Sequence, residues 1–199
     1  MDSTLFEWIN RLADRTTWAH GAMRFYAGYG MVVFACLLLV AFLRSRHRHD
    51  LRGVAGALWA GAAALVALGI GQLIGTAVDR ARPYAALANV HVLIDRTTDF
   101  SFPSDHATAV GAVAVGLVLA ERRLGVLAVV AAVWMAFTRV YVGAHYPLDV
   151  LAGLLLGGAV ALVGARLLVP NLERALHRLA ASPLGFIVTA TTAVAEAAP

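Results

Sequence analysis

The sequence contains no lysine and a single cysteine, and these two absences limit the chemistry that is open to it. All 16 basic residues are arginine, so no lysine can act as a general base or as a phosphate ligand. The lone cysteine, Cys36, excludes an intrachain disulfide and any metal site built from several cysteines. Charged residues are also scarce, at 14% of the chain, whereas a soluble domain carries about 25%. The shortfall places the chain among membrane proteins.

Apolar residues are abundant instead: they make up 60% of the chain and give it a mean hydropathy of +0.75. A membrane-spanning helix needs about 20 mostly apolar residues, and five stretches qualify when the third is extended to include a first turn from Pro103. The stretches are residues 27–43, 54–78, 107–120, 124–140 and 148–169. The sequence therefore predicts an all-α integral membrane bundle with about five transmembrane helices, in one domain over residues 1–199 with its core at 27–169. Two glycine pairs spaced four apart, Gly71 with Gly75 and Gly153 with Gly157, predict close helix packing.

The two ends of the chain are less apolar than the predicted spans. Thr4 and Glu7 have the spacing of a helix-capping box, and apolar residues then recur at helical spacing, so residues 1–26 are expected to contain an amphipathic helix. That helix either lies in the membrane interface or packs on the bundle as a soluble helix. The segment has no signal-peptide pattern. Residues 170–199 are expected to form a cytoplasmic tail, because their stretch 184–199 is too short and too polar for a sixth span.

The arginines outside the apolar stretches indicate which way the chain crosses the membrane. Three groups fall on one side of a five-span bundle: Arg44, Arg46, Arg48 and Arg52; Arg122 and Arg123; and Arg166, Arg174 and Arg178. The positive-inside rule makes that side cytoplasmic. This placement at helix ends also argues against nucleic acid as a partner, despite a pI near 9.8. The first basic group could recruit anionic lipid, although topology alone explains it.

Unusual polar residues collect on the opposite, extracytoplasmic side in three clusters. The clusters are Asp79–Pro83, Phe102–His106, and Thr138-Arg139 together with His145 and Asp149. Ionisable residues at the ends of spans are functional candidates, because they are costly in a membrane. Segments far apart in the sequence are thus expected to meet at one membrane depth.

These residue types suit the transfer of a phosphoryl group. Arg82 and Arg139 could hold an oxyanion with their planar guanidinium groups, and the helix that follows Pro103 could bind phosphate at its first turn, assisted by the Ser104 hydroxyl. His145 and Asp149 would share one helical face, so the carboxylate could accept the Nδ1 proton and leave Nε2 free to attack phosphorus. His106 could protonate the leaving oxygen. Such a reaction requires no metal ion or other cofactor.

The three clusters together resemble the motifs of the type 2 phosphatidic acid phosphatase superfamily, which read Lys-x6-Arg-Pro, Pro-Ser-Gly-His and Ser-Arg-x5-His-x3-Asp. In this chain they read Gly75-x6-Arg82-Pro83, Pro103-Ser104-Asp105-His106 and Thr138-Arg139-x5-His145-x3-Asp149. The resemblance implies that His145 is the nucleophile, Asp149 its orienting partner and His106 the general acid. It further implies that Arg82, Arg139 and Ser104 bind the phosphate.

Three positions depart from the family pattern. Gly75 stands where the family has lysine, and Arg80 is a candidate to supply the missing positive charge. Asp105 replaces a glycine, and a carboxylate beside bound phosphate is unfavourable unless it caps the helix or pairs with an arginine. Thr138 replaces serine and keeps the hydroxyl group. Arg80 and Asp105 are therefore included among the expected substrate-binding residues.

The strings Ser-Phe-Pro-Ser-Asp-His and Tyr-Val-Gly-Ala-His-Tyr-Pro-Leu-Asp look most like bacterial undecaprenyl-diphosphate phosphatases of that superfamily, which are linked to bacitracin resistance. The resemblance implies a bacterial plasma-membrane enzyme that recycles the polyprenyl carrier of cell-wall synthesis from its diphosphate. Two alternatives remain open: a phosphatase for phosphatidylglycerophosphate or phosphatidic acid, and a non-catalytic protein that binds or translocates lipid phosphates. The sequence leaves the oligomeric state undetermined.

Overall fold

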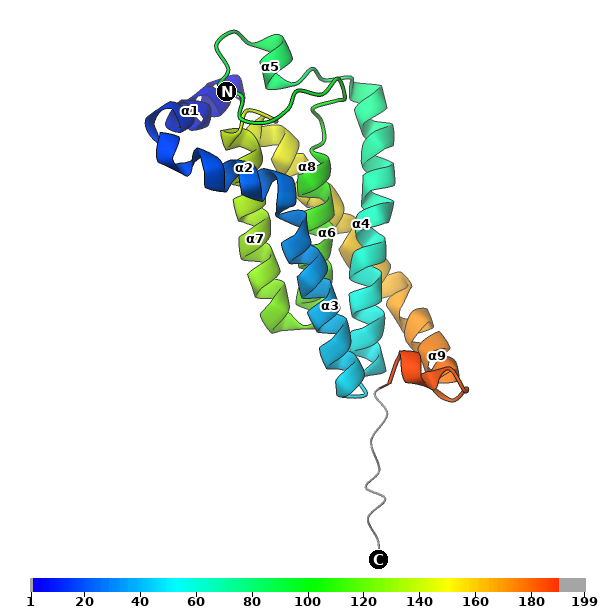
Figure 1. Cartoon of the computed structure of the whole chain (residues 1–199). Coiled ribbons are helices and arrows are strands. Elements are labelled where there is room, and N and C mark those ends of the chain that lie inside the picture. Colours follow the sequence, from blue (N-terminus) through cyan, green and yellow to red (C-terminus); the bar gives the residue numbers. More distant parts are fainter. Residues whose placement is uncertain (1, 190–199) are drawn as a thin grey trace, which may run out of the picture.

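The structure, a computed structural model, describes residues 2–189. This part of the chain is helical and contains no strand, which confirms the predicted all-α class. In chain order the elements are α1 (Asp2–Arg15), η1 (Thr17–Ala19), α2 (His20–Tyr29), α3 (Met31–His47), α4 (Leu51–Val78), α5 (Pro83–Ala86), α6 (Asp105–Ala120), α7 (Arg122–Tyr141), α8 (Pro147–Leu167), α9 (Val169–Ala180) and η2 (Gly185–Ile187). The long helices run side by side in roughly the same direction. Helices α1, α2 and α5 lie at the upper end of the bundle and α9 at the lower end (Figure 1).

Helix α6 is the centre of the bundle and packs against α3, α4, α7 and α8. Alanine and glycine dominate its sequence, so neighbouring backbones approach it closely. A Cβ atom added at Gly153 of α8 would lie 2.7 Å from the Ser104 carbonyl oxygen, and one added at Gly157 would collide with the carbonyl of Thr108. The close packing predicted for Gly153 and Gly157 is therefore confirmed, and it fixes the start of α6 beside the start of α8.

The predicted spans differ from the helices in one important place. Three helices (α4, α7 and α8) are long and apolar enough to cross a membrane, and α2 with α3 forms a fourth candidate that is bent by 53°. The expected span 27–43 is therefore not one straight helix, because the chain bends at Gly30, where an added Cβ would lie 2.6 Å from the Met135 side chain of α7. The apolar helix α6 has 16 residues and is about 24 Å long, shorter than a hydrocarbon core of about 30 Å. A count of five spans stays a prediction.

Helix α1 packs on the upper end of the bundle through one face and leaves another exposed. It begins by Asp2, so the capping box expected at Thr4 and Glu7 is wrong, and Thr4 lies within the first turn. Phe6 is buried against Tyr146, with 5.5 Å between the ring centroids, whereas Trp8 is 68% exposed. The buried face agrees with a helix that packs on the bundle. The exposed apolar face agrees with a helix that lies in the membrane interface.

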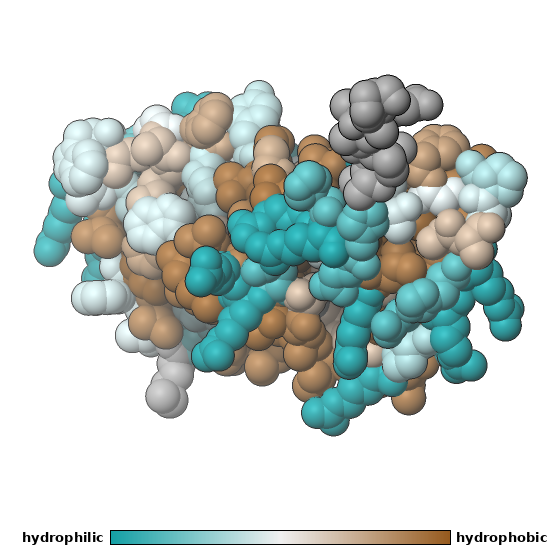
Figure 2. Space-filling view, turned by 90° about the horizontal axis from the view of Figure 1, so that it is seen from below, coloured by the Kyte–Doolittle hydropathy of each residue, from teal (hydrophilic) through white to brown (hydrophobic). Residues whose placement is uncertain are grey.

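The lower end carries the three groups of arginines and a helix that the sequence pattern did not indicate. Figure 2 views this end and shows hydrophilic side chains spread across a largely apolar surface. Helix α9 is amphipathic and buries Leu176 near the start of α4. Arg46 then donates hydrogen bonds to the carbonyls of Phe186 and Ile187, at 2.6 and 3.1 Å. The expected tail thus includes a packed helix, and its residues 190–199 lie outside the described part.

Candidate active site

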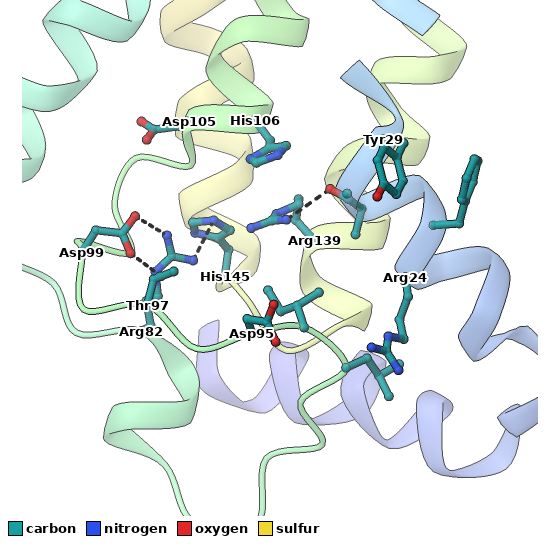
Figure 3. A pocket seen from close by; sticks show the side chains of 15 residues that line it. Arg24, Tyr29, Arg82, Asp95, Thr97, Asp99, Asp105, His106, Arg139 and His145 are labelled. Carbon is teal, nitrogen blue, oxygen red and sulfur yellow. Dashed lines mark hydrogen bonds and ion pairs between the residues drawn. The ribbon is translucent and has the colours of Figure 1, made fainter. Parts of the chain in front are cut away.

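The three polar clusters meet around one cavity of about 570 Å³ at the upper end of the bundle. Five of the eight predicted site residues line it: Arg82, Asp105, His106, Arg139 and His145. They come from the loop after α4, the start of α6, the end of α7 and the turn between α7 and α8 (Figure 3). The other three, Arg80, Ser104 and Asp149, are not among the lining residues.

His145 lies in the turn between α7 and α8, where it is 2% exposed. Its Nδ1 is 2.8 Å from the carbonyl oxygen of Ser101, and its Nε2 is 3.3 Å from Nη1 of Arg82. A carbonyl only accepts hydrogen bonds, so Nδ1 carries the proton, and the Nε2 lone pair accepts the N–H of Arg82 Nη1. Burial lowers the pKa of the imidazole well below its usual value, and the charges of Arg139 and Arg82 act in the same direction. The ring is therefore neutral and lies close to two cations.

The predicted bond from the Asp149 carboxylate to Nδ1 of His145 is wrong, because Nδ1 bonds the Ser101 carbonyl. The two residues do not share a helical face, because α8 begins at Pro147 and His145 precedes it. The carboxylate of Asp149 instead accepts hydrogen bonds from the Ser101 hydroxyl at 2.5 Å and from the Tyr146 backbone N–H at 2.9 Å. Asp149 thus holds Ser101, whose carbonyl binds the imidazole, and Tyr146, which follows His145 in the chain.

Arg80 supports Asp149 rather than lining the cavity. Its guanidinium donates to Asp149 Oδ1 at 2.6 Å and to Asp2 Oδ2 at 2.6 Å, and it lies 4.0 Å from the centre of the Tyr146 ring. Although partial burial opposes the charge, the two carboxylates raise the pKa of Arg80. Both ends of its guanidinium fork are thus bound to carboxylates, and the expectation that Arg80 replaces the family lysine as a phosphate ligand stays a prediction.

Arg82 and Arg139 place two buried positive charges at the cavity, and in the view of Figure 3 His145 lies between them. Arg82 donates to the Ala144 carbonyl at 3.3 Å and to Asp99 at 2.9 Å, and Arg139 donates to the Ala27 carbonyl at 3.5 Å. The Nε atoms of both arginines are buried and have no hydrogen-bond partner. Two buried guanidinium groups that line one cavity give it a positive potential, which favours an anion as its occupant.

Asp99 is a site residue that the sequence analysis missed. Its carboxylate pairs with Arg82 and also accepts a short hydrogen bond from the Thr97 hydroxyl. Although burial opposes ionisation, these hydrogen bonds and the charge of Arg82 hold the pKa of Asp99 below its usual range. The side chain is 53% exposed, so a bound anion could displace it from Arg82. It lies in a loop whose sequence carries no periodic signal.

The start of α6 contributes Asp105 and His106 to the cavity lining. Asp105 accepts hydrogen bonds from Gln72 at 3.0 Å through both carboxylate oxygens, so its charge faces α4 (Figure 3). Ser104 is fully buried and caps the helix by accepting from the Ala107 N–H at 3.5 Å. The helix therefore begins at Asp105, after the Ser104 cap, and not at Pro103 as expected. The proposed contact of Ser104 with phosphate stays a prediction.

Gly75, at the position of the family lysine, packs closely against the loop that contains Phe100 and Phe102. A Cβ atom added at Gly75 would lie 3.1 Å from the Phe100 ring and 3.2 Å from the Phe102 carbonyl, because the loop lies directly on α4. A further cation that the sequence analysis missed, Arg24 of α2, lines the outer part of the cavity. Within residues 2–189, no group of three or more His, Cys, Asp or Glu side chains is placed to hold a metal ion.

Comparison with known proteins agrees with this geometry. The family model described as "PAP2 superfamily" matches residues 56–173, which contain all three polar clusters. The chain belongs to the PAP2 superfamily. It is 32% identical over 156 residues to undecaprenyl-diphosphatase BcrC of Bacillus subtilis, covering 77% of each chain. It is also 38% identical over 136 residues to decaprenylphosphoryl-5-phosphoribose phosphatase of Mycobacterium tuberculosis, covering 67% of this chain and 69% of the relative.

The fold of this PAP2 protein is also found in a solved structure. The crystal structure of Aquifex aeolicus LpxE aligns with a TM-score of 0.64 at 23% identity, covering 83% of this chain and 94% of that one. The similarity shows that the two chains share their overall fold. The motif-based resemblance is thus confirmed at the level of family and fold, and the protein is a lipid phosphatase of the PAP2 class.

Proposed function

We propose that this PAP2 protein hydrolyses the diphosphate of a polyprenyl lipid, with undecaprenyl diphosphate as the expected substrate, to the lipid monophosphate and inorganic phosphate. The observation that carries the proposal is that the buried guanidinium groups of Arg82 and Arg139 line one cavity together with His145, whose proton lies on Nδ1. A terminal phosphoryl group placed there would satisfy both guanidinium groups and lie within reach of the nucleophile.

The proposed reaction has two steps. In the first, His145 Nε2 attacks the terminal phosphorus, a P–N bond forms, and the P–O bond to the lipid monophosphate breaks while His106 gives a proton to the departing oxygen. The modified ring gains positive charge, which the Ser101 carbonyl stabilises at Nδ1. In the second step, His106 takes a proton from water, the hydroxide oxygen attacks phosphorus, and the P–N bond breaks to release phosphate.

The outer part of the cavity supports a diphosphate over a monophosphate. The cavity of about 570 Å³ exceeds the needs of one phosphoryl group, since a water molecule occupies roughly 30 Å³. Arg24 lines the part away from Arg82 and forms no ion pair within residues 2–189, so it is available to the second phosphate (Figure 3). Phe25 and Tyr29 also line the cavity; their rings are tilted by 36° with centroids 5.2 Å apart, and their exposed fractions of 67% and 64% suit an apolar lipid chain.

We further propose that the whole chain is a single domain in a bacterial plasma membrane, with its cavity on the extracytoplasmic side and its C-terminal segment in the cytoplasm. The separation of the cavity from the arginine-rich lower end supports this orientation under the positive-inside rule. A polyprenyl carrier released as its diphosphate on the outer leaflet would reach such a site. The product would then be available again as a carrier in cell-wall synthesis, and its removal from the diphosphate form would favour bacitracin resistance.

A panel of lipid substrates tests the proposal. Purified protein in EDTA is expected to release phosphate from undecaprenyl diphosphate with a higher kcat/KM than from phosphatidylglycerophosphate, phosphatidic acid or decaprenylphosphoryl-5-phosphoribose. His145→Ala should abolish release. A preference for one of the monophosphates would replace the proposed substrate, and strict dependence on a divalent metal ion would contradict the mechanism. Binding without turnover of any lipid would favour the non-catalytic alternative.

Arg24→Gln refines the same experiment. The substitution should lower kcat/KM for the diphosphate about tenfold, the effect of losing one charge-assisted contact, and leave that for phosphatidic acid within about twofold. Arg15→Gln is the matched control, because Arg15 ends α1 and does not line the cavity. Equal losses on both substrates would remove Arg24 from the proposed second phosphate site.

A further inference from the structure

Four side-chain contacts connect the first residue of α1 to the nucleophile. Asp2 pairs with Arg80 at 2.6 Å, and Arg80 pairs with Asp149 at 2.6 Å. Asp149 accepts from the Ser101 hydroxyl at 2.5 Å, and the Ser101 carbonyl accepts from Nδ1 of His145 at 2.8 Å. Asp149 and Ser101 are fully buried, so the inner part of this chain of contacts is shielded from water.

Asp2 also contacts α8 directly. Its Oδ1 accepts the backbone N–H of Leu148 at 3.0 Å, one of the donors that the first turn of a helix leaves unpaired. The next residue, Asp149, accepts from the N–H of Tyr146. Two carboxylates therefore hold the start of α8, one from inside the helix and one from α1.

The remainder of α1 keeps Asp2 in place. Phe6 is 1% exposed and packs on Tyr146, whose ring also lies beneath the Arg80 guanidinium. One turn further on, Asn10 donates hydrogen bonds to the carbonyls of His91 at 2.8 Å and Tyr141 at 3.1 Å. Helix α1 is thus attached at several points, and its first carboxylate has a defined position.

We propose that Asp2 is a positioning residue for the nucleophile, which makes the N-terminal amphipathic helix a working part of the catalytic site. Asp2 restrains the guanidinium of Arg80, Arg80 restrains the carboxylate of Asp149, and Asp149 restrains the Ser101 carbonyl that sets the tautomer and direction of His145. Without Asp2, Arg80 keeps one carboxylate partner and can rotate about it. The inference rests on the proposed role of His145, and it assigns to the first turn of α1 a function that lies outside the three motifs.

The test compares Asp2→Asn with Asp14→Asn in the full-length protein. Asp14 is a matched control: it lies on the same helix and pairs with His91 at 2.8 Å, but it has no contact with this chain of residues. Asp2→Asn should lower kcat about tenfold, because a small misplacement of a reacting group slows the reaction steeply, and leave KM within about twofold. Asp2→Glu should recover part of the rate, and Asp14→Asn should match the wild type.

Two further measurements separate positioning from a general loss of structure. In an Arg80→Gln background, Asp2→Asn should cause no further loss, because its effect passes through Arg80. Orthovanadate, which mimics the transition state at phosphorus, should bind Asp2→Asn about tenfold more weakly than it binds wild-type protein. A wild type that turned over no lipid phosphate would remove the proposed function, while the vanadate comparison would still decide the role of Asp2. Wild-type kcat and vanadate affinity in Asp2→Asn, equal losses in Asp14→Asn, or additive losses with Arg80→Gln would each overturn the inference.

Discussion

A single ring nitrogen determines the chemistry at the scale of the residue. The four-residue spacing of His145 and Asp149 predicted a direct bond between them, and the structure has another partner at Nδ1. The acceptor for Nδ1 is the backbone carbonyl of Ser101, and a carbonyl leaves no mark on the sequence because every residue has one. Asp149 acts one bond further away, through the hydroxyl of the same serine.

The depressed pKa of His145 predicts how activity responds to acid. Because the neutral ring is the nucleophile and burial lowers its pKa, His145 should stay active as the pH falls below about 6.5, the usual histidine value. Native-state stability should instead decrease below that pH, since only the unfolded chain then takes up the proton. NMR titration of the His145 ring nitrogens in detergent measures the first effect and thermal unfolding against pH the second. Titration of His145 at or above the usual value would contradict the assignment.

Asp99 predicts a gain in affinity when its charge is removed. The carboxylate occupies Arg82, so substrate phosphate must compete with it. Asp99→Asn should lower KM about two- to fivefold, the range expected for an exposed ion pair. Asp79→Asn provides the control, since Asp79 ends α4 in a left-handed conformation that asparagine also adopts, and it has no ion pair within residues 2–189. An unchanged or higher KM in Asp99→Asn, or the same decrease in both variants, would show that Asp99 does not compete with the substrate.

At the scale of the element, the sequence predicted the long apolar helices well and the short polar ones poorly. Helices α4, α7 and α8 lie within a few residues of the expected spans, because continuous apolar runs have few alternatives in a membrane. The bend at Gly30 and the helix α9 were not predicted. At the bend, a Cβ added to Gly30 would meet the Met135 side chain of α7, a tertiary contact that the sequence does not show. Helix α9 gains its stability from packing one amphipathic face.

The contact between α6 and α8 predicts which glycines can be replaced. Gly157→Ala would push a methyl group into the backbone of α6 at Thr108 and Ala112, so it should destabilise the protein by about 1–3 kcal/mol. Gly69→Ala, on α4, meets nothing within 4 Å and should be neutral or slightly stabilising, because alanine favours helix. Thermal unfolding in detergent separates the two. Equal melting temperatures would show that α6 and α8 are less closely packed than the structure has them.

At the scale of the whole molecule, the two ends of the bundle carry different features. The upper end holds the cavity, and the lower end holds the arginine groups together with α9 (Figure 1). The three motifs could be assigned to one end from the sequence because each follows or precedes an apolar run. The contributions of Arg24 and Asp2 could not, because α1 and α2 reach the cavity only through packing that no motif encodes.

Cysteine labelling of intact cells tests the orientation of the two ends. In a Cys36→Ser background, a cysteine at Asp95, beside the cavity, should react with a membrane-impermeant maleimide. A cysteine at Arg123, at the start of α7, should react only after the cells are opened. Both sites are in the part of the chain that the structure describes. The reverse pattern would place the cavity in the cytoplasm and contradict the proposed role in carrier recycling.

Trapping the phosphorylated enzyme tests the central claim most directly. Protein mixed with polyprenyl diphosphate that carries a labelled terminal phosphate, and quenched within a turnover, should carry the label on His145 as an acid-labile phosphohistidine. His145→Asn should carry none, whereas Asp14→Asn should be labelled like the wild type. Rapid turnover by the wild type with no label on the protein, or with label on a residue other than His145, would contradict the account.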